Sequence, residues 1–238
     1  MPYLSRIWMN PLRRQAQALL RNPHALHAAV LGGLSRQPVT ERVLWRLDTN
    51  REHRAELLVL TESTPSWEHL IEQAGWPGSD EPQQVVRDYQ PLLDQVVHGR
   101  AYRFRLRANP VTATRRPDKP SGSQQKQLAR ERPRGVRVPH RTAAHRLSWF
   151  TERVERWGFE PLTTADGGPA VRLIARERLD FAKRSDVAAH RVVLSTATFD
   201  GLMRVTDAAQ ARGSLLGGVG PGKGYGCGLI TLAPLDGG

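Results

Sequence analysis

The first hundred residues alternate short apolar runs with apolar residues at helical spacing. Leu26, Val30 and Leu34 recur every four residues and predict a helix that ends near Leu34. Its start is predicted at Asn22-Pro23, because asparagine caps helices and proline suits the first helical turn. Further helices are predicted at about 12–20 and 66–74, and strands at 3–9, 43–47, 57–60 and 85–89. The resulting order β-α-β-β-α-β is that of a ferredoxin-like domain.

The second half opens on a strictly alternating segment. Its even positions are apolar and its odd positions are arginine: Tyr102, Phe104, Leu106 and Ala108 against Arg103, Arg105 and Arg107. Successive side chains of a strand point to opposite faces, so the segment predicts a half-buried strand with an arginine ladder on its open face.

The rest of the second half repeats the order of the first. Residues 111–140 are rich in Pro, Ser, Gly, Gln and Arg and predict a mobile basic loop. A helix at 142–157, strands near 171–181, 192–197 and 202–205, a short helix at 208–212 and a strand at 229–232 follow. We therefore predict an α+β protein with two tandem ferredoxin-like (RRM-like) domains, residues 1–97 and 98–238, the second carrying a basic loop insertion.

Charge is concentrated in one part of the chain. The net charge is +12, yet residues 1–100 carry 11 basic and 11 acidic residues, and residues 151–238 carry 11 and 10. Residues 101–150 carry 13 basic and 2 acidic residues. A bias toward arginine over lysine explains the choice of cation, but not the loss of acidic residues from this block alone. The block therefore predicts a polyanionic partner, with nucleic acid favoured.

A glycine loop near the C-terminus, residues 217–228, is the second distinctive feature. It contains seven glycines around a single lysine, Lys223. Glycines admit close backbone approach, and exposed N–H groups beside a lysine form an anion cradle. A nucleotide-binding P-loop is disfavoured because Gly224 stands where that motif needs serine or threonine. The alternative is a tight loop that only packs against a helix.

Several classes of protein are disfavoured by what the sequence lacks. No apolar run of 18 residues and no signal-like start are present, so a cytoplasmic protein without a membrane partner is predicted. The single cysteine, Cys227, excludes an internal disulfide and thiolate metal clusters. The eight histidines are scattered, and the pairs His24/His27 and His140/His145 lack the acidic partners that a metal site normally adds. We expect neither a metal site nor a cofactor.

Several ordered motifs resemble the CasE endoribonucleases, which process CRISPR precursor RNA in subtype I-E systems and belong to the RAMP superfamily. The motifs are Gly218–Lys223 with Gly226–Leu229, Phe104–Pro110, Arg137-Val138-Pro139, Trp149 with Gly158-Phe159, and His24-Ala25-Leu26-His27. The resemblance covers nearly the whole chain and implies two ferredoxin-like domains in tandem. It also implies metal-independent cleavage of a repeat hairpin, with the product kept within a surveillance complex.

Catalysis without a metal ion is expected to depend on the N-terminal histidines. The 2′-OH of RNA can attack the adjacent phosphorus when a base, a charge-stabilising group and a proton donor are supplied. His27 matches the family's catalytic histidine and is the expected base. His24 stands where the family commonly has tyrosine, and either donates a proton or takes no part. Ser35 matches a serine near the reacting phosphate in some relatives.

The expected RNA-binding residues come from the basic block and the glycine loop. Lys223 is expected to contact phosphate beside Gly218, Gly220, Gly222, Gly224 and Gly226. The arginines expected to follow the hairpin backbone are Arg36, Arg103, Arg105, Arg107, Arg134, Arg137 and Arg141. The expected partners are repeat hairpin RNA, as precursor and mature guide, and the other subunits of the surveillance complex. A non-catalytic RNA-binding protein or a structural subunit of a ribonucleoprotein remains the alternative.

Overall fold

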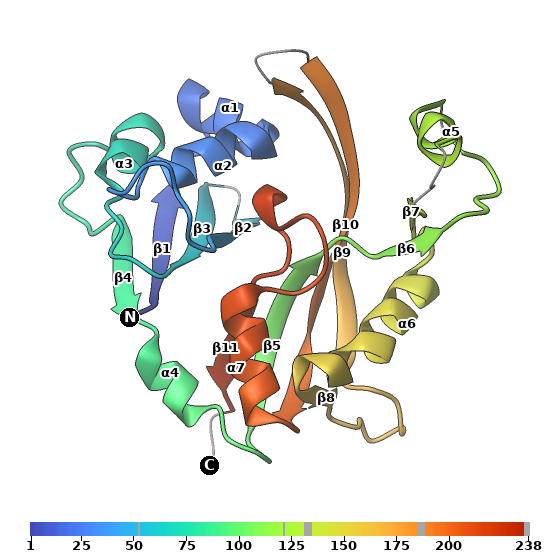
Figure 1. The fold of residues 1–238 in the computed structure, drawn as a ribbon. Helices are drawn as coiled ribbons and strands as arrows, with labels where there is room; N and C mark the ends of the chain where they lie inside the picture. Colours follow the sequence, from blue (N-terminus) through green and yellow to red (C-terminus); the bar gives the residue numbers. More distant parts are fainter. Residues whose placement is uncertain (52, 121, 131–134, 185–188, 236–238) are drawn as a thin grey trace.

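The computed structural model describes residues 1–51, 53–120, 122–130, 135–184 and 189–235 (Figure 1). The first half contains β1 Tyr3–Met9, α1 Arg14–Arg21, α2 Pro23–Leu31, β2 Leu44–Arg51, β3 Arg54–Thr61, α3 Glu68–Ala74, β4 Gln84–Asp88 and α4 Gln90–Gln95. The second half contains β5 Ala101–Ala108, β6 Val111–Thr114, α5 Gly122–Leu128, β7 Val136–Pro139, α6 Ala143–Val154, η1 Glu155–Trp157, β8 Phe159–Pro161, β9 Val171–Arg184, β10 Ala189–Val205, α7 Ala208–Gly217, η2 Lys223–Tyr225 and β11 Ile230–Pro234.

The first sheet has the strand order β2-β3-β1-β4, and all its pairs are antiparallel. This is the ferredoxin-like arrangement that the sequence predicts. One face of the sheet is apolar because alternate residues of its strands, such as Ile7 and Val59, point to the same side. Leu26 and Val30 of α2 complete that core.

The second sheet repeats the same arrangement. Its order is β11-β5-β10-β8, and β9 also pairs with β10. Strands β9 and β10 form a long ribbon that extends well beyond the rest of the sheet (Figure 1). The apolar face of β5 packs on α6, where the rings of Phe104 and Phe150 stack with centroids 5.2 Å apart.

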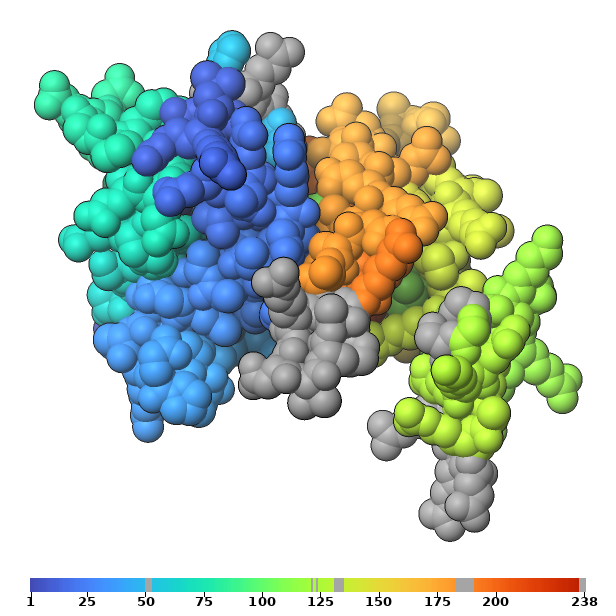
Figure 2. Space-filling model, turned by 90° about the horizontal axis from the view of Figure 1, so that it is seen from above, coloured from blue at the N-terminus to red at the C-terminus, as the bar shows by residue number. Residues whose placement is uncertain are grey.

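Four local predictions are corrected by the structure. Residues 111–140, expected as a mobile loop, contain the paired strands β6 and β7 with α5 between them. This light-green segment projects from the body of the molecule (Figure 2). Strands expected at 192–197 and 202–205 are one strand, β10, which passes Gly201 without a break. Helix α2 ends at Leu31 rather than Leu34, and the helix expected at 208–212 extends to Gly217.

The two sheets share a continuous apolar core. Leu44, Leu58 and Leu60 of the first sheet point away from α2 and belong to the same cluster as Leu106 and Ile230 of the second. The face of the first sheet that carries no helix therefore packs on the second half of the chain. This packing fixes how the two halves sit together, and with them the site between them.

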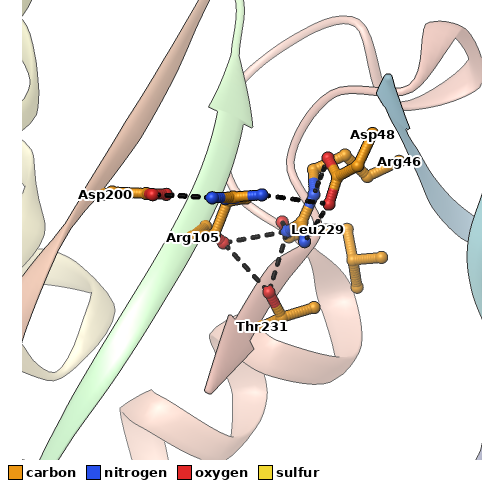
Figure 3. Close-up of polar contacts among 6 residues, drawn as sticks. All are labelled: Arg46, Asp48, Arg105, Asp200, Leu229 and Thr231. Atoms are coloured by element: carbon orange, nitrogen blue, oxygen red, sulfur yellow. Dashed lines mark hydrogen bonds and ion pairs between the residues drawn. The ribbon is translucent and has the colours of Figure 1, made fainter. Parts of the chain in front are cut away.

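A chain of alternating charges crosses this junction (Figure 3). Arg46, whose side chain is 3% exposed, donates two hydrogen bonds to Asp48, at 2.8 and 3.0 Å. Its remaining NH1 protons reach the carbonyl of Arg105 and the hydroxyl of Thr231 in the second sheet. Arg105 in turn pairs with Asp200 at 2.7 Å and with Asp48 at 3.6 Å. Every buried charge in this network therefore has a partner of opposite sign, as burial requires.

Candidate active site and nucleic-acid interface

His27 lies on the side of α2 that faces the second half of the chain. The helix begins where predicted, because the Asn22 side chain accepts hydrogen bonds from the amides of His24 and Ala25. Leu26 and Val30 anchor the buried stripe of the helix, and this places His27 at the edge of that stripe, half-buried. The short helix thus presents an imidazole at the junction of the two domains.

The His27 ring is held by Trp45 of β2. The indole Nε1 donates a hydrogen bond to Nδ1 of His27 at 3.2 Å. The two rings lie within 23° of parallel with centroids 6.5 Å apart, an edge-to-edge placement that suits this bond. Burial, and secondly the nearby charge of His24, lower the pKa of His27 below its usual value. The imidazole is therefore neutral at pH 7.

The glycine loop packs directly against these two residues. A Cβ on Gly226 would lie 2.6 Å from Cζ3 of Trp45, and a Cβ on Gly224 would lie 3.5 Å from Nε2 of His27. A Cβ on Gly218 would lie 2.7 Å from Leu44. Gly226 has a φ of 76°, which other residues rarely adopt. The loop therefore needs glycine to approach the N-terminal domain, so the packing role weighed from the sequence is real.

The same loop carries Lys223, next in sequence to the glycine that contacts the histidine. Lys223 immediately precedes Gly224 and is half-buried, with the stem of its side chain against Gly228. Burial, and secondly the charge of Arg42, lower the pKa of Lys223. Among the described residues neither Lys223 nor Arg42 has an acidic partner within ion-pair distance. Within the described chain the loop that contacts the neutral imidazole at Gly224 therefore also carries a cation without an acidic partner, and this combination suits a phosphate.

The other residues predicted to take part in catalysis contact the His27 ring less closely than Trp45 and the glycine loop do. His24 lies one turn before His27 on α2 and is half-buried, near enough to influence its proton binding. Ser35 and Arg36 lie beyond the end of α2 and are exposed. No contact in the described part of the chain joins either of them to His27. The structure thus brings together His24, His27 and Lys223, and leaves Ser35 and Arg36 at the periphery.

The predicted open arginine ladder on β5 is corrected at two of its three positions. Arg105 is bound by Asp200 and Asp48, and this pairing raises its pKa. Arg107 is buried and paired with Glu177 of β9. Only Arg103 remains exposed. The ladder faces the junction between the sheets, where acidic residues from β2, β9 and β10 meet it. We therefore assign Arg105 to the network that joins the two domains, through Asp48, and Arg107 to an ion pair within the second domain.

A basic groove lies on the other side of the second domain. It has a volume of about 670 Å³ and lies between the β6–β7 hairpin, the start of α6 and the β9–β10 ribbon. Four arginines line it, and none of its described lining residues is acidic: Asn109, Val111, Arg137, Pro139, Arg141, Arg146, Arg178, Val193, Leu194 and Ser195. Arg137 and Arg141 were expected from the sequence and are exposed there. Arg134 lies outside the described residues.

Arg146 is a groove residue that the site predictions missed. It is 6% exposed and donates to the carbonyls of His140 and Thr196 and to the hydroxyl of Ser195. Burial, and secondly Arg176, lower its pKa. Within the described chain it has no carboxylate partner, so an anion in the groove would offset its charge. One feature of the sequence indicates its burial. Arg146 has the helical spacing of the buried residues Trp149, Phe150 and Val154 and therefore lies on the buried face of α6.

Two searches of the described residues complete the description. No helix is long and apolar enough to cross a membrane. No group of three or more His, Cys, Asp or Glu side chains is arranged to hold a metal ion. The thiol of Cys227 is buried, and burial raises its pKa to about 12.

Comparisons with known proteins agree on one family. A family model described as "CRISPR associated protein" matches residues 2–234. The chain is 31% identical to the CRISPR-associated endoribonuclease Cse3 of Thermus thermophilus, over 98% of this chain and 100% of that protein. It is 29% identical to the CRISPR system Cascade subunit CasE of Escherichia coli, over 81% and 89% of the two chains. The structure of Cse3 bound to a 19-nucleotide RNA matches with a TM-score of 0.72 and 30% identity, over 98% of this chain and 100% of that one.

Proposed function

Because the chain belongs to the CRISPR-associated endoribonuclease family of Cse3 and CasE, we propose that it cleaves the repeat hairpins of CRISPR precursor RNA without a metal ion. The mature guide RNA stays bound within a multisubunit surveillance complex. Of these relatives, Cse3 is named an endoribonuclease and has been solved with bound RNA, and CasE is named a Cascade subunit. The similarity spans both halves of the chain, which supports placing the site at their junction.

One observation supports this reaction above the others. The Nε2 edge of His27 faces Gly224, and the adjacent residue of the loop is Lys223, a cation without an acidic partner among the described residues. A phosphodiester held by Lys223 would place its reacting oxygens next to the imidazole. Histidine is suited to proton transfer near neutral pH, and preorganised cations stabilise the charge that develops on the phosphate.

The proposed reaction uses the RNA's own hydroxyl as the nucleophile. The 2′ oxygen forms a bond to phosphorus, the bond from phosphorus to the 5′ oxygen breaks, and a proton passes from the first oxygen to the second through the protein. The products are a 2′,3′-cyclic phosphate and a 5′-hydroxyl. His27, His24 and Lys223 supply the proton-handling and charge-stabilising groups that this reaction requires.

The RNA hairpin is proposed to bind in the basic groove. Its arginines come from β7, α6, β9 and the loop between β7 and α6, so they can contact phosphates at several points along a backbone. A-form major grooves are too narrow for most side chains, and recognition there depends on shape and phosphate position. The exposed Arg137, Arg141 and Arg178, with the buried Arg146 behind them, fit that form of recognition.

We expect cleavage to continue unchanged in EDTA and to stop when the hairpin carries a 2′-deoxy nucleotide at the cut site. The deoxy sugar lacks the attacking oxygen, whereas a metal-activated water would not need it. Mass spectrometry of the 5′ fragment should find the cyclic phosphate. Loss of activity in EDTA with recovery in Mg²⁺, or a 3′-hydroxyl product, would refute the mechanism. Tight binding without any cleavage would instead favour an RNA-binding subunit.

Replacing both Arg137 and Arg141 by alanine should weaken hairpin binding and flatten its salt dependence. Each lost phosphate contact reduces the slope of log K against log salt by about 0.7 to 0.9, so the pair should reduce it by roughly 1.5. Arg6→Ala with Arg87→Ala is a matched control. It removes the same charge from a shallow groove in the first sheet. Equal changes in both double variants would contradict the location of the RNA site.

A further inference from the structure

We infer that Trp45 holds His27 in one tautomer, so that His27 serves the proposed cleavage as a neutral N–H donor rather than as the general base. The inference rests on the proposed function for its catalytic part only. Its structural part, the position of the imidazole proton, stands on the contacts of two residues.

The polarity of the Trp45–His27 bond is unambiguous. An indole nitrogen can only donate a hydrogen bond. Its partner, Nδ1 of His27, must therefore offer a lone pair and carry no proton. In a neutral imidazole the single proton is then on Nε2.

Trp45 has little freedom to release this bond. Its side chain is 1% exposed, and it lies in the core formed by α2 and the first sheet. The backbone of Gly226 covers the indole so closely that a methyl group there would collide with it. The indole is thus held between the glycine loop and the histidine. The loop that carries Lys223 also keeps Trp45 in position.

The proton on Nε2 points toward the proposed phosphate position. The Nε2 atom is the part of the ring nearest to Gly224, the neighbour of Lys223. A base at this position needs a lone pair on Nε2, and this would put a proton on Nδ1, facing the indole N–H. Two donors would then meet and the bond would be lost. A neutral imidazole whose pKa is lowered can instead polarise an oxygen by donating its N–H.

This arrangement reverses the roles expected from the sequence. His27 would donate a hydrogen bond from Nε2 to the phosphate oxygen on which negative charge develops, and would keep its proton. The proton of the 2′ hydroxyl would go to His24, the second imidazole on the helix, and return through water to the 5′ oxygen. Trp45 is a positioning residue in this scheme, because it acts only through His27.

The tautomer can be measured directly in the protein without RNA. Nitrogen-15 NMR of histidine-labelled protein, with His27 assigned by its absence in His27→Ala, should show a protonated Nε2 and an unprotonated Nδ1. Trp45→Phe should lose this pattern and show a mixture of tautomers. Trp67→Phe is the matched control, since the buried indole N–H of Trp67 has no hydrogen-bond partner in the described structure. A protonated Nδ1 in the wild-type protein would overturn the inference.

Cleavage rates then separate a donor from a base. A glutamine at position 27 can donate from its amide but cannot accept a proton at pH 7, so His27→Gln should cleave at least about tenfold faster than His27→Ala. Trp45→Phe should cleave about 2- to 10-fold more slowly than the wild type, the usual effect of one hydrogen bond. Equal rates for His27→Gln and His27→Ala, or faster cleavage by Trp45→Phe, would show that His27 is a base.

The two proposals fail in different ways. If the hairpin is not a substrate, or if His27→Ala cleaves it at the wild-type rate, the proposed function or its site is wrong, and the donor role falls with it. The NMR measurement would still report the tautomer that Trp45 imposes. If cleavage depends on His27 but the tautomer is the opposite one, only the inference about Trp45 is wrong.

Discussion

His27→Ala is expected to slow single-turnover cleavage of a repeat hairpin by about 10²- to 10⁴-fold while binding remains within a few-fold of the wild type. The Nε2 edge of the imidazole faces Gly224 of the glycine loop, and its loss would remove the proposed contact to the reacting phosphate. Binding should survive because the chain has 35 basic residues and the groove arginines are elsewhere. Rapid-quench kinetics would measure the cleavage rate, and filter binding would measure the affinity for the hairpin.

The pH dependence of the same reaction adds an independent test. Burial lowers the pKa of His27 below its usual value of about 6.5, so the ring becomes half-protonated on the acid side of that value. The midpoint of the decline in the part of the rate that depends on the neutral ring should therefore also lie on the acid side of about 6.5. In Trp45→Phe the indole no longer opposes protonation of Nδ1, and the decline should move to higher pH. If the wild-type cleavage rate already falls with decreasing pH while the pH is still above 7, the burial of this ring would be contradicted.

Arg46→Ala is expected to destabilise the protein by about 3–5 kcal/mol, because it removes the closer of the two cations that pair with the largely buried Asp48 and leaves only Arg105 at 3.6 Å. Asp48, 12% exposed, would lose two hydrogen bonds, and the Arg105 carbonyl and the Thr231 hydroxyl would lose their link to the first domain. For a protein of this size the melting temperature should fall by on the order of 10 °C. Thermal and urea unfolding followed by circular dichroism would measure the change.

Arg204→Ala is the control for this effect. Arg204 also forms an ion pair, with Glu160 at 3.1 Å, but both side chains are about half exposed. Pairs of this kind contribute about 0–1 kcal/mol, because water solvates the two ions nearly as well. A similar loss of stability in both variants would show that the network across the domain junction has no special role.

Predictions that depend on neighbours in the sequence agree well with the structure. The capping of α2 by Asn22 and the buried face of β5 both follow from residues within a few positions of one another. The strand order of both sheets follows from the repeated β-α-β-β-α-β pattern. The hairpin at 111–139 was missed because its residues are polar and carry little periodic signal, although their backbones pair.

The sequence by itself determined the two ferredoxin-like sheets, the family, the basic block and the short list that contains His27 and Lys223. Only the tertiary structure decided which charges stay available to a ligand and where the imidazole proton lies. Alternation along β5 shows that its three arginines share a face, but the acidic residues that meet Arg105 and Arg107 come from other strands. Trp45 and Gly224 likewise reach His27 from a β-strand and a loop that lie far from it in the chain. Hydrogen bonds and ion pairs act over a few ångströms in space, and such distances between remote residues are set by packing, which a local pattern does not encode.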